Sequence, residues 1–138
     1  MKKIEGGCLC GAIRYSCDAA PLMQAICNCR NCQRQSGSAF SIIVAVPKGA
    51  LVFEGLPPAV YQDVGDSGLP VLRKFCPNCG SPLLSEVAAT PTMDWIKAGT
   101  LDDTSWLQPQ LNLWCDSAQP WVRMSDELPR IPRNPPSS

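Results

Sequence analysis

Seven of the nine cysteines occur in three short clusters, in a chain that contains no histidine. Thiols two or three residues apart suit a shared metal ion better than bonds to one another, and disulfides alone would leave one of the nine thiols over. Because metal-bound cysteines are thiolates, zinc is the ion that this pattern favours. The clusters are Cys8 and Cys10, then Cys27, Cys29 and Cys32 (the triad), then Cys76 and Cys79.

The third cluster lies in CPNCG, at residues 76–80, which is a zinc knuckle. A knuckle supplies two ligands and requires two more. Cys8 and Cys10 can provide them, because alternate residues of an extended segment point the same way. Two cysteines of the triad are the other option, but the separation from Cys32 to the knuckle is long for a compact ribbon. We therefore prefer a structural site made by the first and third clusters.

The triad then stands alone, and three thiolates leave one of zinc's four positions free. Three protein ligands plus water or substrate are typical of catalytic zinc. Spacing alone leaves open the alternative that Cys17, Cys115 or Asp116 closes the site. Both extra cysteines also fit the role of small buried hydrophobes.

Short apolar segments bounded by turn residues must position these clusters. Helical periodicity is weak, and the one helical turn expected covers residues 29–37, where Gly37 would end it. Ile13, Tyr15 and Cys17 alternate along one predicted strand and should share a face. The pattern predicts a mainly β protein with antiparallel sheets. The expected strands cover residues 12–17, 39–46, 50–55, 70–75, 82–87 and 93–99.

One domain is expected from a chain of 138 residues that is 45% hydrophobic. Residues 1–128 should form a single zinc-binding domain. The proline-rich residues 129–138 should form a tail, since they cannot sustain a helix or a central strand.

Charge and hydropathy exclude several classes of partner. The 12 basic and 12 acidic residues balance, which disfavours nucleic acid. No apolar run reaches membrane-spanning length, and the N-terminus lacks the apolar core of a secretory signal, so we expect a cytoplasmic protein. Basic residues near the clusters, such as Arg34 and Arg73, can balance zinc–thiolate centres or hold a carboxylate.

Three segments, GGCLCGAIRYSC, CNCRNCQRQSGSAF and RKFCPNCGSPL, resemble in this order the signature segments of the glutathione-dependent formaldehyde-activating enzyme family, which includes the centromere protein V domain. The resemblance spans residues 5–87, with a weaker echo at 116–129. It implies an Mss4-like fold of small antiparallel sheets organised around a structural zinc. It also implies two zinc ions per chain, one held by Cys8, Cys10, Cys76 and Cys79, and a second, more labile catalytic one held by the triad.

The resemblance further implies an enzyme that joins formaldehyde to the thiol of glutathione or a similar small molecule, as a carbon–sulfur lyase or synthase. Asn28 and Asn112 stand where the family often has histidine. Without histidine, a zinc-bound substrate thiol is the natural source of thiolate at neutral pH. The alternative is a non-catalytic, zinc-stabilised binding module of the same fold. The oligomeric state is left open, with a dimer as one option.

The segment after the triad offers candidate substrate-binding residues. Gly37 permits close approach of the backbone to a ligand, the hydroxyls of Ser36 and Ser38 can donate hydrogen bonds, and Arg34 can pair with a carboxylate. The same residues also fit a purely structural role at a helix end and a strand start.

Overall fold

A computed structural model describes residues 3–134 of the chain. Strands dominate this part of the protein and form two sheets. The strands are β1 (Ile4–Gly7), β2 (Ile13–Cys17), β3 (Met23–Cys27), β4 (Ser41–Pro47), β5 (Val52–Gly55), β6 (Ala59–Val64), β7 (Pro70–Phe75), β8 (Pro82–Val87), β9 (Met93–Lys97) and β10 (Leu111–Leu113). The helical elements are α1 (Arg30–Ser36) and the 3-10 turns η1 (Ala98–Thr100) and η2 (Cys115–Ser117).

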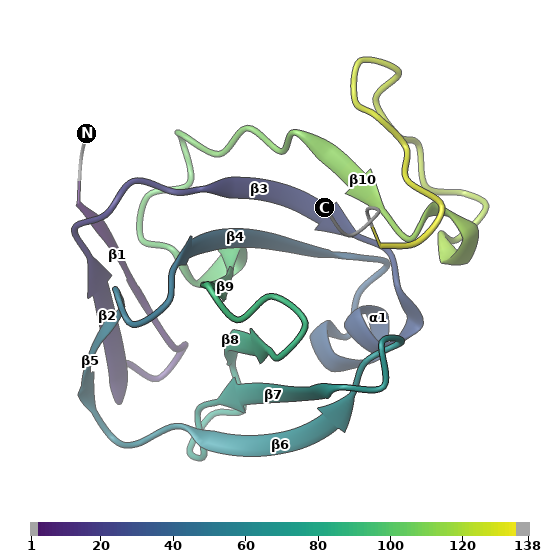
Figure 1. Ribbon diagram of the computed structural model, residues 1–138. Coiled ribbons are helices and arrows are strands. Elements are labelled where there is room, and N and C mark those ends of the chain that lie inside the picture. Colours follow the sequence, from purple (N-terminus) through teal and green to yellow (C-terminus); the bar gives the residue numbers. More distant parts are fainter. Residues whose placement is uncertain (1–2, 135–138) are drawn as a thin grey trace.

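The larger sheet has the order β10-β3-β4-β9-β8-β7-β6, and the smaller one has the order β1-β2-β5. Adjacent strands are antiparallel except β10, which runs parallel to β3. The larger sheet curves strongly, so that β3 and β4 lie across from β6 and β7, with α1 between them at one end (Figure 1). The helix therefore sits in the concave side of the sheet.

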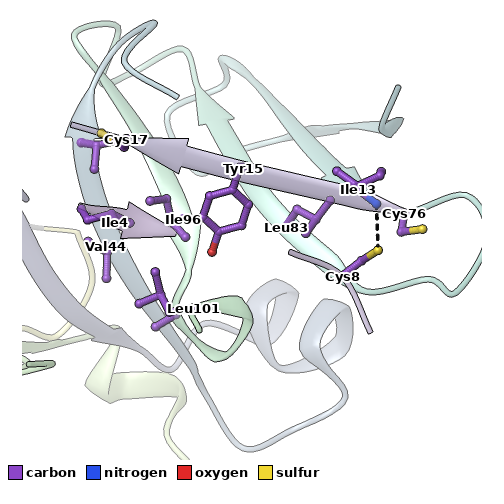
Figure 2. Close-up of a cluster of buried hydrophobic side chains, with 12 residues drawn as sticks. Ile4, Cys8, Ile13, Tyr15, Cys17, Val44, Cys76, Leu83, Ile96 and Leu101 are labelled. Atoms are coloured by element: carbon purple, nitrogen blue, oxygen red, sulfur yellow. Dashed lines mark hydrogen bonds between the residues drawn. The ribbon is translucent and has the colours of Figure 1, made fainter. Parts of the chain in front are cut away.

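The main core lies where the smaller sheet packs against the larger one. Ile13, Tyr15 and Cys17 of β2 all point into it, as their alternation predicted, and none is more than 4% exposed (Figure 2). Val44 of β4 and Ile96 of β9 meet them from the larger sheet. Two opposing apolar faces, each from a different sheet, thus give the domain its centre.

Gly6 allows β1 to approach this core closely. A Cβ at residue 6 would lie 2.4 Å from both the Thr100 carbonyl oxygen and the Tyr15 hydroxyl. The Tyr15 hydroxyl is itself hydrogen-bonded to Thr100 Oγ1 at 2.7 Å. Any side chain at residue 6 would therefore disturb the contact between the smaller sheet and η1.

The mainly β, antiparallel prediction is confirmed, and each of the six expected strands is present. β7 and β8 have the expected bounds, and the other four differ at one or both ends. Four strands were not expected: β1, β3, β6 and β10. β1 contains two glycines and β10 has three residues, so neither gives a clear pattern. The parallel pairing of β10 with β3 also departs from an all-antiparallel arrangement.

The described part of the proline-rich tail lies along β10. Asn112 N–H donates to the Pro129 carbonyl at 2.9 Å, and Ile131 N–H donates to the Asn112 carbonyl at 2.8 Å. Ile131 also packs on the small cluster that contains Ala25 and Leu113. The predicted tail also includes residues 135–138, which lie outside the described range. Among residues 3–134, the helices are all too short to traverse a lipid bilayer.

Candidate metal centres

The first cysteine group joins two turns that are far apart in the sequence. The sulfur atoms of Cys8, Cys10, Cys76 and Cys79 all lie within 4.8 Å of one another. Two of these separations are 3.6 Å, between Cys8 and Cys10, and 3.8 Å, between Cys10 and Cys76. Tetrahedral zinc with Zn–S bonds of about 2.3 Å requires sulfurs about 3.8 Å apart. The four thiols therefore fit a closed zinc site.

Backbone amides around this four-cysteine group point at its sulfurs. Ile13 N–H donates to Cys8 Sγ at 3.2 Å (Figure 2), and the N–H groups of Asn78 and Cys79 donate to Cys76 Sγ. Gly80 takes the left-handed conformation, with φ of 79°, that closes the knuckle. Hydrogen bonds from Ser81, side chain first, lower the pKa of Cys79 to about 5. Such donors favour the thiolate form that a metal requires.

The triad occupies the junction between β3 and α1. Cys27 is the last residue of β3, Cys29 is the N-cap of α1, and Cys32 lies in its first turn. Cys29 Sγ accepts a hydrogen bond from Cys32 N–H at 3.1 Å, and the sulfurs of Cys27 and Cys32 lie 3.5 Å apart. All three sulfurs are within 4.8 Å of one another, which also fits zinc. A cysteine here takes the capping role usual for serine or aspartate.

Candidate fourth ligands from the sequence lie elsewhere. Within residues 3–134, no further cysteine or carboxylate joins the triad. Cys17 lies in the main core, and its thiol faces the Ala19 carbonyl. Cys115 faces the Asn112 carbonyl and the Met124 sulfur. The described chain therefore offers three ligands at this site.

Two buried basic side chains accompany the triad, Arg73 from β7 and Lys97 from β9. Arg73 donates to Asp63 Oδ2 at 3.0 Å, and Lys97 donates to Ser41 Oγ at 3.3 Å. Hydrogen bonds from the other two thiols lower the pKa of Cys32, and the charges of Lys97 and Arg73 add to that effect. The two basic side chains therefore favour the thiolate form of Cys32, which a metal would require.

The loop that carries the triad is fixed by two buried amide side chains. Asn28 Nδ2 donates to the Leu113 carbonyl at 2.9 Å, which ties the loop to β10. Gln33 Nε2 donates to the carbonyls of Asn28 and Ser117, at 2.7 and 3.0 Å. These bonds tie the triad loop to β10 and to η2.

The four predicted substrate-binding residues separate into two groups. Arg34, Gly37 and Ser38 line a surface cavity of about 380 Å³, together with Arg30, Gln33 and Gln119. Ser36 instead donates its hydroxyl to the Cys32 carbonyl at 2.7 Å, within the helix. Cys32 is two positions from Arg34, or about 200° around the helix axis. The cavity thus opens on the face of α1 that points away from Cys32.

Residues 3–117, which contain both cysteine groups, match a known protein family, described as glutathione-dependent formaldehyde-activating enzyme. The chain belongs to this family. A solved structure is also similar to this family member: a Rhodobacter sphaeroides protein, with 18% sequence identity and a TM-score of 0.59. That match covers 76% of this chain and 91% of the other, and at this identity it shows the fold alone. The closer likeness to Mss4 stays a prediction.

Sequence reasoning missed the polar side chains that surround the triad in this formaldehyde-activating enzyme family member. Arg73 was named only as a basic residue close to the clusters in sequence, and the structure places it with Cys32. Lys97 had a usable signal, because a lysine at the end of the apolar strand MDWIK is unusual in a buried position. Asn28 was noted only because it stands where the family often has histidine, and the sequence did not indicate the structural hydrogen bonds of Asn28 and Gln33.

Proposed function

We propose that this protein joins formaldehyde to the thiol of glutathione, or of a similar small molecule, at the triad. In this proposal it is a zinc-dependent carbon–sulfur lyase acting in the direction of synthesis. The observation that carries the proposal is a site of three clustered thiols without a fourth protein ligand among residues 3–134, in a member of this family. Water or a substrate thiol would take the free position.

Two zinc ions per chain are part of the proposal. Cys8, Cys10, Cys76 and Cys79 would hold a structural ion, and the triad would hold a second, more labile one. When bound at the triad, zinc would supply one effect, a pKa of the coordinated substrate thiol low enough to make it a thiolate at neutral pH. The chain's own residues must then place that thiolate beside the aldehyde.

The proposed reaction balances without an oxidant or reductant. The substrate S–H bond breaks and its proton leaves. A lone pair of the thiolate sulfur forms the new S–C bond with the formaldehyde carbon, while the π electrons of the C=O bond move to oxygen. That oxygen takes up a proton, so the product is the S-hydroxymethyl derivative of the thiol, a hemithioacetal. The chain has no imidazole for these proton transfers, since it contains no histidine.

The cavity beside α1 is our candidate for the carboxylate ends of the substrate. Arg30 and Arg34 bring two guanidinium groups to it, and arginine suits carboxylates. A peptide with its thiol at the triad would reach this cavity by passing around the N-terminal end of α1, at Cys29. Ser38 would contribute a hydroxyl there, whereas Ser36 would act through the helix.

A cytoplasmic location is also proposed, since all nine cysteines are free and a reducing compartment keeps them so. The proposed partner is a small thiol, with no nucleic acid or membrane. The oligomeric state, for which a dimer is one option, is left to measurement.

The test combines metal analysis with a rate measurement. We expect close to two zinc ions per purified chain, one of them removed readily by a chelator. Isotope-labelled formaldehyde and glutathione, followed by NMR, should give the S-hydroxymethyl product faster with the protein than in buffer. Cys29→Ser should lose this acceleration. A protein that holds two zinc ions but gives only the rate in buffer would favour the non-catalytic binding module.

A further inference from the structure

The concave face of the larger sheet carries a row of buried polar side chains. In register, Arg73 pairs with Ser85, and Ser85 pairs with Trp95. Lys97 lies two positions beyond Trp95. Paired residues and alternate residues of a strand lie on the same face of a sheet. Arg73, Ser85 and Lys97 therefore share one face, and each is less than 9% exposed.

The triad lies on the same face. Lys97 pairs with Ile43, Ser41 lies two positions before Ile43, and Ser41 pairs with Cys27. The electrostatic interactions agree with this register. Burial is the main cause that lowers the pKa of Lys97, while the charge of the Cys32 thiolate counteracts it. Burial acts to lower the pKa of Arg73, but the charge of Cys32 and the hydrogen bond and charge of Asp63 raise the pKa overall.

Ser85 gives the independent sign that this face binds something. Its side chain is 5% exposed, and its Oγ has no hydrogen-bond partner in the described chain. An unsatisfied buried hydroxyl costs free energy and is uncommon in native proteins. It sits between Arg73 on one neighbouring strand and Trp95 on the other. A ligand that accepts a hydrogen bond would satisfy it.

The charge balance says which kind of ligand suits this face. Three thiolates and one divalent ion carry a net charge of minus one. Arg73 and Lys97 add two positive charges, and Asp63, which is bonded to Arg73, subtracts one, so the group is neutral before a further ligand arrives. An added anion would leave a net charge of minus one with both basic residues present. Without Arg73 and Lys97, the same anion would leave a net charge of minus three, which a buried site tolerates poorly.

We propose that Arg73, Ser85 and Lys97 form an anion-binding wall opposite the triad, which makes the site select an anionic sulfur or oxygen ligand over a neutral one. The role of this wall in a reaction rests on the proposed function. The wall would hold the substrate as thiolate and then bind the oxygen on which negative charge develops as the S–C bond forms. Donors placed where charge develops are the usual source of such stabilisation.

The binding test needs neither formaldehyde nor glutathione. The protein is loaded with cobalt(II), and its absorption spectrum is titrated with mercaptoethanol, which binds as an anion, and with imidazole, which binds as a neutral molecule. The four-cysteine site is closed and adds a constant background. Lys97→Met should weaken mercaptoethanol binding about 10–100-fold, the range typical for groups that support metal ligands. Imidazole binding should change by less than about threefold.

Three further variants separate this role from a structural one. Lys97→Arg, which keeps the charge, should retain most of the affinity for mercaptoethanol. Ser85→Ala should weaken that affinity about tenfold, the loss expected for a hydrogen bond to a charged group, without lowering the melting temperature, because the hydroxyl has no protein partner. Lys74→Gln is the matched control, since Lys74 neighbours Arg73 but pairs with Glu86. It should leave both titrations unchanged.

Equal effects of Lys97→Met on both ligands, or none on either, would overturn the proposal. So would a Ser85→Ala variant that binds mercaptoethanol like the unaltered protein. If Lys97→Met fails to fold, Ser85→Ala and Lys97→Arg decide the matter. The proposed function can fail separately: selective loss of mercaptoethanol binding without any catalysed condensation would keep the wall and discard the reaction.

Discussion

Replacing Cys76 by serine should destabilise the protein far more than replacing Cys29 by serine. Both substitutions remove one sulfur from a cysteine group and are nearly the same size. Serine at residue 29 also keeps an N-cap for α1, because serine is a favoured capping residue. The two variants therefore differ mainly in which part of the chain the metal closes into a loop.

The size of the effect follows from these loops. Cys10 and Cys76 are 66 residues apart, whereas Cys27 and Cys32 are 5 apart. Treating a metal link as a cross-link, the entropy lost by the unfolded chain corresponds to about 4 kcal/mol for the long loop and about 2 kcal/mol for the short one. For a chain of this size, that is a melting temperature lower by about 15 °C for Cys76→Ser and about 7 °C for Cys29→Ser.

The assay is thermal unfolding followed by circular dichroism, at equal protein concentration and with zinc measured in each sample. Cys17→Ser is a control outside both groups, although it lies in the core. Zinc content should fall by about one ion in each of the two main variants. If the two variants lose similar stability, or if Cys29→Ser is the less stable, the assignment of a structural and an open site is wrong.

Three other predictions address the substrate cavity, the helix loop and the core. Arg34→Gln should raise the KM for glutathione several-fold with kcat and unfolding unchanged, and an unaltered KM would remove Arg34 from the substrate site. Gln33→Ala should cost about 2–4 kcal/mol in urea denaturation, since one buried and one part-buried carbonyl lose their donor. Gln35→Ala, whose Oε1 has no partner in the described chain, should cost less. Tyr15→Phe should flatten the loss of stability at alkaline pH. Burial raises the pKa of Tyr15 to about 12, so its stabilising contribution is present below pH 10 and is lost as the pH rises from 10 to 12. Identical profiles of stability against pH for the two proteins would contradict this.

Sequence patterns predicted the fold where apolar alternation was strong. β2 shows it best, because Ile13, Tyr15 and Cys17 all enter the core. The helix was predicted because Gly37 marks its end, and Gly37 does adopt the left-handed conformation there. β6 was missed since it is an edge strand with exposed apolar side chains, so its pattern does not distinguish a buried face.

The candidate site was only half visible in the sequence. Cysteine spacing is local, and the two groups that it suggested are those that the structure brings together. Arg73, Ser85 and Lys97 come from three strands, and only the register of the sheet puts them on one face. No spacing rule connects residues of different strands before their pairing is known. Long-range partners of a site are therefore the part that sequence reasoning leaves out.

The bond between Asn28 and Leu113 has a consequence for the order in which the protein folds. Asn28 N–H and its side-chain amide both donate to the Leu113 carbonyl, 85 residues further along. During synthesis, the triad emerges long before β10 and the tail that lies along it. Contacts of such high sequence separation form slowly. The triad is therefore synthesised long before Leu113, whose carbonyl fixes its loop, is available.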